Sequence, residues 1–169
     1  MTGDQKRVAT GAISGVLFIA LSVWLLQREL PIPTVATTGD HLGYAAKWAA
    51  FAAVPFFLML VVVGNERFFS EAIDPTLGNE GQRMIVYGRV ADNTTQQLLL
   101  FVIAALALAA NLPAERLPII GGAAITFVIV RIAFWIGYRI RPVYRAFGFA
   151  GTAYLNLGLL ASALYLSIR

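Results

Sequence analysis

The stretch Arg131–Arg145, RIAFWIGYRIRPVYR, holds four arginines and two tyrosines among bulky apolar residues. An arginine near the middle of a bilayer helix costs about 2.5–3.5 kcal/mol on insertion scales, so it persists where it is paired, hydrated or bound to a ligand. Arg131 and Tyr138 are seven residues apart, close to two helical turns, and therefore share one helical face. Pro142 interrupts that helix, so we expect Arg145 to open the next one. We interpret the stretch as a polar site at a membrane edge.

The overall composition is that of an integral membrane protein. Of the 169 residues, 59% are hydrophobic and the mean hydropathy is +0.73, which is too apolar for a soluble domain of this size. We therefore predict an all-α helical membrane bundle that contacts the lipid bilayer. Cysteine is absent and His41 is the only histidine, so we expect no disulfide, no cysteine nucleophile and no metal site. The basic residues are scattered, and we expect no nucleic-acid partner.

Five apolar runs are long enough to cross a bilayer as helices. The first follows Lys6 and Arg7, as in a signal peptide, but it is longer than a usual signal sequence and no small-residue cleavage motif follows directly, so we expect it to be retained. We divide the chain into an N-terminal transmembrane helix and loop over residues 1–43 and a four-helix membrane domain over residues 44–169. The loop is predicted over residues 28–43, where two prolines precede a TTGD turn. The predicted spans are Val8–Gln27, Tyr44–Val63, Met84–Ala110, Leu117–Tyr138 and a fifth from Tyr144 or Arg145 to Ser167.

The distribution of basic residues predicts the orientation. With five spans, the basic N-terminus, the polar segment 64–83 and the arginine-rich turn near Arg139 fall on one side of the membrane. Because lysine and arginine are enriched in cytoplasmic loops, we expect the N-terminus and the proposed site on the cytoplasmic side of a multi-pass protein.

A second group of polar residues opens the third span. Arg89, Asn93 and Gln96 follow one another at i, i+4 and i+7, which places them on one helical face. An arginine and two amides offer donors for carboxylates and partners for peptide groups. The predicted topology puts this face at the same depth as Arg131–Arg145, so the two groups can converge within a subunit or across a subunit interface.

Simpler explanations exist for each of these residues. The Arg89 face can be a solvated helix end, and Arg139 and Arg141 can serve as topology signals and interfacial anchors. Tyr138 can belong to an aromatic belt at the membrane surface. Arg131 lies seven residues inside the polar end of its helix, and a structural ion pair is the plain explanation for it.

The ordered pair RVADNTTQQ (89–97) and RIAFWIGYRIRPVYRAFGF (131–149) resembles the MAPEG superfamily, the membrane-associated proteins in eicosanoid and glutathione metabolism. The resemblance covers roughly residues 44–167. It implies a four-helix subunit, a homotrimer, and glutathione bound between neighbouring subunits near the cytoplasmic side. The first 43 residues then add a transmembrane helix to the family's four-helix core.

The family's motifs imply roles for individual residues. Arg145 would stabilise the glutathione thiolate as the catalytic residue. The residues implied in binding glutathione, the co-substrate, are Arg89, Asn93, Gln96, Arg131 and Tyr138, with Arg141 as a second candidate. The implied activity is that of a membrane glutathione-dependent transferase or peroxidase, acting on an apolar electrophile that enters from the lipid along an intersubunit groove.

Two departures from the family pattern favour an alternative. Gln96 stands where the family has a glutamate, and Phe134 where some members have a tyrosine. Both changes remove a group that would contact glutathione, so a non-catalytic lipid-binding or scaffold protein on the same fold is the alternative function. A small transporter or channel subunit is a third hypothesis, disfavoured because the polar residues gather on one side of the membrane.

Overall fold

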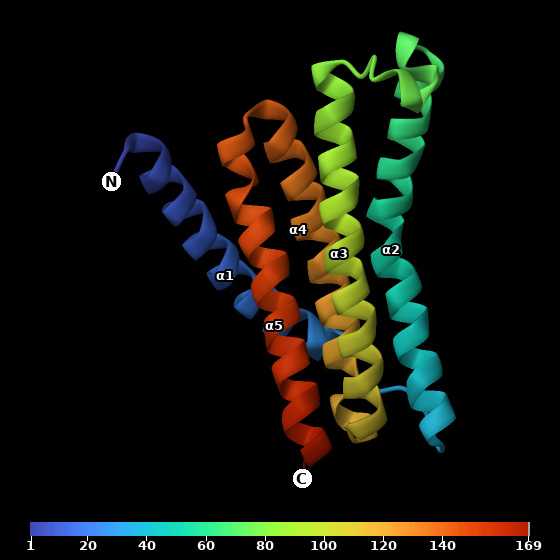
Figure 1. The fold of residues 1–169 in the computed structure, drawn as a ribbon. Helices are drawn as coiled ribbons and strands as arrows, with labels where there is room; N and C mark the ends of the chain where they lie inside the picture. The colour runs from blue at the N-terminus through green and yellow to red at the C-terminus, as the bar shows by residue number, and fades with distance from the viewer. Residues whose placement is uncertain (169) are drawn as a thin grey trace.

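The computed structural model describes residues 1–168, and within them all regular secondary structure is helical, without a β-strand. All five long helices have the length and composition to cross a membrane, which confirms the predicted helical membrane bundle. Figure 1 shows four of them running roughly alongside one another, with the first inclined to the rest. The helices are α1 (Gly3–Glu29), α2 (Thr38–Phe68), α3 (Gln82–Asn111), α4 (Pro118–Ile140) and α5 (Ala146–Ile168).

The second helix begins earlier than the sequence pattern predicted. We expected a turn at TTGD and a helix from Tyr44, but α2 starts at Thr38. The Thr37 side chain accepts a hydrogen bond from the Asp40 backbone N–H, and the Asp40 carboxylate accepts one from the Thr37 backbone N–H at 2.9 Å. This reciprocal capping satisfies donors that an α-helix leaves open at its start. The prediction of a loop reaching residue 43 was therefore wrong, and the 43/44 division falls inside α2.

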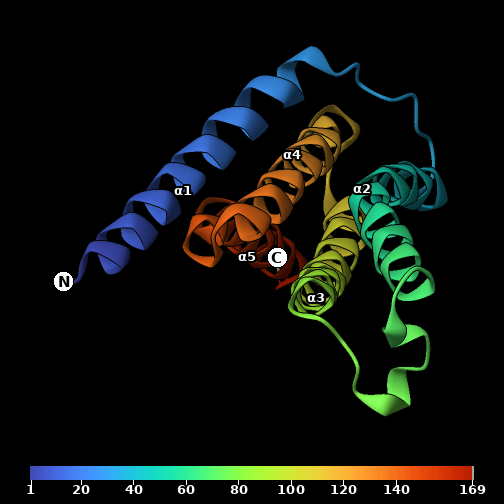
Figure 2. The ribbon, with the colours of Figure 1, turned by 90° about the horizontal axis from the view of Figure 1, so that it is seen from above.

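The fourth helix lies at the centre of the bundle. In an apolar 18-residue segment of each spanning helix, the buried share of residues is 56% for the span that contains α4. It is only 11% for α1. Seen from above, α4 lies between α1 on one side and α2 and α3 on the other (Figure 2). The largest buried cluster joins α3 and α4 through residues such as Phe101 and Phe127, whose ring centroids lie 5.0 Å apart. Thr126 and Arg131 of α4 are thus removed from the surface of the bundle.

The first helix packs along the outer side of α4 and α5 as an integral part of the bundle. The hydroxyl oxygens of Ser22 on α1 and Thr126 on α4 are 2.8 Å apart. The rings of Phe18 on α1 and Phe147 on α5 lie 5.5 Å apart, centroid to centroid. These contacts show that α1 packs against α4 and α5.

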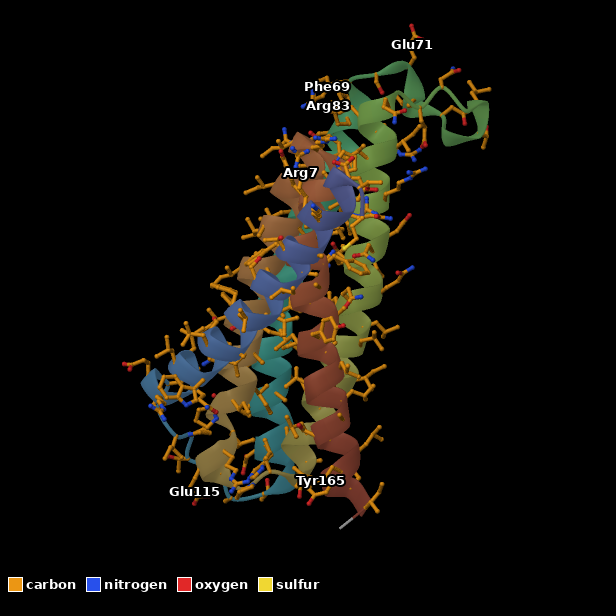
Figure 3. All side chains as sticks on the ribbon, turned by 90° about the vertical axis from the view of Figure 1, so that its left-hand side faces the viewer. Arg7, Phe69, Glu71, Arg83, Glu115 and Tyr165 are labelled. Carbon is orange, nitrogen blue, oxygen red and sulfur yellow. The ribbon has the colours of Figure 1, made fainter. Side chains whose placement is uncertain are left out.

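Three segments distant in sequence meet at one end of the bundle. Figure 1 shows the N-terminus, the connection between α2 and α3, and the turn between α4 and α5 at the same end. Arg7 and Arg83 lie at this end, and Glu115 lies at the other (Figure 3). Within the α2–α3 connection, Asp74 accepts hydrogen bonds from the hydroxyl and backbone N–H of Thr76, which lower the pKa of its carboxyl below the usual value.

Candidate functional site

Arg131 lies at the centre of the candidate site. Its side chain is completely buried, and both terminal nitrogens donate hydrogen bonds. Nη1 donates to Thr152 Oγ1 at 3.0 Å, and Nη2 donates to Asn93 Oδ1 at 3.0 Å and Thr94 Oγ1 at 2.8 Å. The guanidinium carbon lies 4.1 Å from the centroid of the Phe134 ring, in the geometry of a cation–π contact. We call Arg131, Asn93, Thr94 and Thr152 the Arg131 cluster.

The charge of Arg131 has only neutral acceptors around it. None of the ion pairs among residues 1–168 includes this guanidinium, and its Nε has no hydrogen-bond partner there. The structural ion pair that would be the plain explanation for Arg131 is therefore not found. A buried charge without a counter-charge costs several kcal/mol. The described residues therefore give this cation neutral hydrogen-bond acceptors but no counter-charge.

The two threonines are oriented by their own helices. The Thr94 hydroxyl donates to the Val90 carbonyl at 2.7 Å, and the Thr152 hydroxyl donates to the Gly148 carbonyl at 2.8 Å. Each hydroxyl has a single proton, so this leaves its lone pairs facing Arg131. Sequence reasoning missed both threonines, although Thr94 directly follows Asn93. Thr152 carried no signal, because only the packing of α5 on α4 brings it to Arg131.

Tyr138 and Arg145 lie beyond the Arg131 cluster, toward the end of the bundle where α4 turns into α5. The ring centroids of Phe134 and Tyr138 are 5.7 Å apart, and the Arg145 guanidinium carbon lies 5.0 Å from the Tyr138 ring centroid. Arg145 ends the 3₁₀ turn Pro142–Arg145, so α5 begins one residue later than predicted. Gly137 permits this turn to fold back, since a Cβ there would lie 2.6 Å from the Tyr144 carbonyl oxygen.

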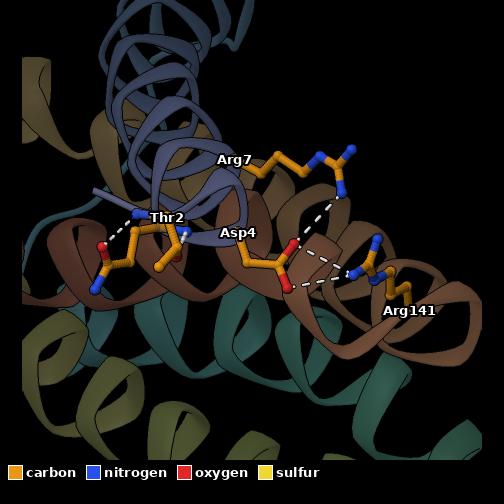
Figure 4. A network of polar contacts seen from close by, with 5 residues as sticks. Thr2, Asp4, Arg7 and Arg141 are labelled. Carbon is orange, nitrogen blue, oxygen red and sulfur yellow. Dashed lines mark hydrogen bonds and ion pairs between the residues drawn. The ribbon is translucent and has the colours of Figure 1, made fainter.

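Arg89 and Gln96 do not join the Arg131 cluster. Both side chains are exposed on α3, and within residues 1–168 neither has an ion-pair or hydrogen-bond partner. Asn93 is thus the one member of the predicted α3 face that the structure connects to Arg131. Arg141 also points elsewhere, because its Nη2 lies 3.2 Å from each carboxylate oxygen of Asp4 on α1 (Figure 4).

Comparison with known protein families matches the MAPEG family over residues 45–165. The chain belongs to the MAPEG family. The match includes all of α3 and α4 and most of α2 and α5, but it leaves out α1. Comparisons with curated proteins and with solved structures found no match for the chain. The family membership predicted from the two motifs is therefore confirmed, and α1 is the part of this MAPEG protein that the family match does not explain.

Several side chains at this end of the MAPEG protein are of the kinds that bind carboxylate and peptide groups. Arg131 is buried and preoriented, whereas Arg145 and Arg89 are exposed cations without a carboxylate partner among the described residues. Arginine presents several N–H donors in a fixed planar arrangement that fits carboxylates. Amide and phenol groups at Asn93 and Tyr138 can exchange hydrogen bonds with peptide groups.

Proposed function

We propose that the protein is a membrane glutathione-dependent transferase or peroxidase acting on apolar electrophiles, with glutathione as co-substrate. Membership of the MAPEG family, whose members take part in glutathione and eicosanoid metabolism, supports the coarser assignment. The observation that carries the finer one is Arg131, a fully buried cation whose partners are all neutral. A bound anion would provide the counter-charge that the described residues lack.

In this proposal Arg145 stabilises the reactive thiolate. A free cysteine thiol has a pKa near 8.5 and is mostly protonated at neutral pH, while the thiolate is the nucleophile. A cation within about 4–6 Å lowers such a pKa by roughly 1–3. Arg145 immediately precedes α5, whose N-terminus adds partial positive charge. With an aryl halide, the thiolate sulfur attacks the ring carbon, a C–S bond forms, and the halide leaves with the bonding electron pair.

The remaining site residues would hold the rest of glutathione. We assign Arg131, Asn93 and Tyr138 to its carboxylate and peptide groups. Arg89 and Gln96 would bind from a neighbouring subunit of a homotrimer, because both are exposed and unpartnered in the described chain. Arg141 is the second candidate near the thiol, although its pairing with Asp4 competes with that role. The proposed site would face the cytoplasm.

Conjugation of a generic aryl halide with glutathione tests the proposal. The purified protein in detergent is expected to show the ultraviolet absorbance of a bound thiolate and to turn over the halide. Arg145→Ala should lose both, whereas Arg139→Ala, which removes an exposed arginine lying over the Tyr87 ring at the same end, should keep them. Absence of thiolate and of turnover in the unmodified protein at millimolar glutathione would overturn the proposal.

A non-catalytic lipid-binding role remains the second candidate, favoured by one specific cavity. It has a volume of about 820 Å³ and lies between α1 and α5, where mostly apolar side chains line it. Ile19 and Val23 of α1 and Leu155 and Leu159 of α5 are among the apolar residues that line it. Gln96 in place of a glutamate points the same way, because an amide cannot form an ion pair with the glutathione amine. Saturable lipid binding that is independent of glutathione would favour this role.

A further inference from the structure

A second, smaller cavity lies between the start of α1 and the turn that joins α4 to α5. Its volume is about 320 Å³. Among the described residues that line it, Arg145 is the only charged one and the others are apolar. We call it the α1 pocket. It is lined by Val8 and Ala12 of α1, Pro142, Val143 and Arg145 of the turn, and Ala146, Phe149 and Ala150 of α5.

Two contacts join the first helix to the rest of the bundle at this pocket. At its beginning, Asp4 of α1 pairs with Arg141, which precedes the turn, at 3.2 Å (Figure 4). At the pocket itself, α1 and α5 approach closely, because a Cβ built on Gly11 would lie 3.2 Å from the Cβ of Ala146, a lining residue. The wall that Val8 and Ala12 provide is therefore formed by the helix outside the family match, which packs against α5 here.

Arg145 belongs both to the α1 pocket and to the polar site. Its guanidinium lies over the Tyr138 ring at 5.0 Å, while its side chain also lines the pocket. Phe149 makes a second connection, since its ring centroid is 6.5 Å from that of Phe134, the ring beneath the Arg131 guanidinium. A molecule in the α1 pocket would thus lie beside any thiolate that Arg145 stabilises.

We infer that the α1 pocket binds the apolar electrophile, and that Val8 and Ala12 of α1 set its size. The volume lies at the lower end of the roughly 300–1,000 Å³ of small-molecule pockets, which fits a single substituted aromatic ring better than a long-chain lipid. Val8 is 42% and Phe149 is 44% exposed, so the pocket opens at a surface of membrane-spanning helices and its ligand can enter from the lipid. The role as a co-substrate site rests on the proposed transferase function; binding of a monocyclic apolar molecule does not.

Filling the pocket from α1 tests this inference. Ala12→Phe should lower kcat/KM for a monocyclic aryl halide by about tenfold or more, because the KM for the halide rises. Ala12→Leu replaces it where the larger side chain impairs folding. The KM for glutathione and the thiolate absorbance should stay unchanged.

The control is Ile13→Phe, which puts the same side chain at the next position of α1, where the native side chain is 62% exposed. It should change kcat/KM for the halide by less than about twofold. Val8→Ala, which enlarges the pocket, should raise kcat/KM for a bicyclic halide.

Photolabelling gives a readout that does not need catalysis. An apolar aryl azide is expected to label the segment 143–150 of the unmodified protein, an excess of the aryl halide should suppress the labelling, and Ala12→Phe should abolish it. Equal kinetics of Ala12→Phe and Ile13→Phe in an active protein would overturn the inference alone. Labelling that the halide does not suppress would also overturn it. An inactive protein with halide-sensitive labelling would overturn the transferase function but support the pocket as a binding site.

Discussion

Gly148 is where α5 approaches α4 most closely beside the Arg131 cluster, and Gly148→Ala is the most informative single substitution. A Cβ at this position would lie 2.5 Å from the Phe134 backbone nitrogen and 2.6 Å from the Phe134 Cβ. Carbon atoms pack best at about 3.5–4.0 Å, so the two helices must separate by roughly 1 Å. No side-chain rotation relieves the contact, because the neighbouring atoms belong to or adjoin the backbone of α4.

This separation also reaches the candidate site. The hydrogen bond from Arg131 Nη1 to Thr152 Oγ1 is 3.0 Å long, and roughly 1 Å more would break it. Overpacking of this kind costs about 1–3 kcal/mol, and a hydrogen bond to a charged group contributes about 1.5–3 kcal/mol. We therefore expect Gly148→Ala to lower the free energy of unfolding by about 3 kcal/mol or more.

Thermal unfolding in detergent, followed by circular dichroism, measures the effect. The matched control is Gly158→Ala on the same helix, where a new Cβ would have nothing within 4 Å. Replacing a helical glycine with alanine stabilises by about 0.5–1 kcal/mol, so the control should match or exceed the unmodified protein. A loss of 1 kcal/mol shifts the Tm by about 2–4 °C in a chain of this length. Equal Tm values for the two variants would refute the close packing at Gly148.

Three further substitutions test other contacts. Asn93→Ala removes a hydrogen bond to Arg131 and should lower the free energy of unfolding by about 1.5–3 kcal/mol in denaturant titration; an unchanged value would contradict the 3.0 Å contact. Asp4→Asn breaks a half-exposed ion pair with Arg141, so the same titration should change by less than about 1 kcal/mol, and a larger loss would show that the pair fixes α1. Gln96→Glu should tighten glutathione binding by about 1 kcal/mol, roughly fivefold in Kd by calorimetry, and an unchanged Kd would contradict a contact between residue 96 and the glutathione amine.

The long helices could be predicted from the sequence because apolar length alone determines which segments can cross a bilayer. All five predicted spans are present, and the break at Pro142 follows from the missing backbone N–H and the fixed φ angle of proline. The start of α2 could not be read in this way. Thr37 and Asp40 are equally typical of turns and of helix caps, and only the observed hydrogen bonds distinguish the two.

The candidate site was predictable only in part. Arg131, Tyr138 and Arg145 stood out because charged and hydroxylated side chains are costly in an apolar helix and their spacing matches helical turns. Whether Arg131 pairs with a carboxylate was not evident, because the answer depends on which helices surround it. The structure gives it Asn93 and Thr94 from α3 and leaves Arg89 and Gln96 exposed.

The sequence by itself determined that Arg131–Arg145 is a polar stretch in a membrane helix that ends at a proline, because hydrophobicity and helical spacing are local properties. Tertiary structure alone decided what surrounds this stretch. It placed Thr152 beside Arg131, set Arg145 between the polar site and the α1 pocket, and paired Arg141 with Asp4. These outcomes depend on the distances at which α1, α3 and α5 pack around α4, and glycines such as Gly148 set those distances across long separations in the chain.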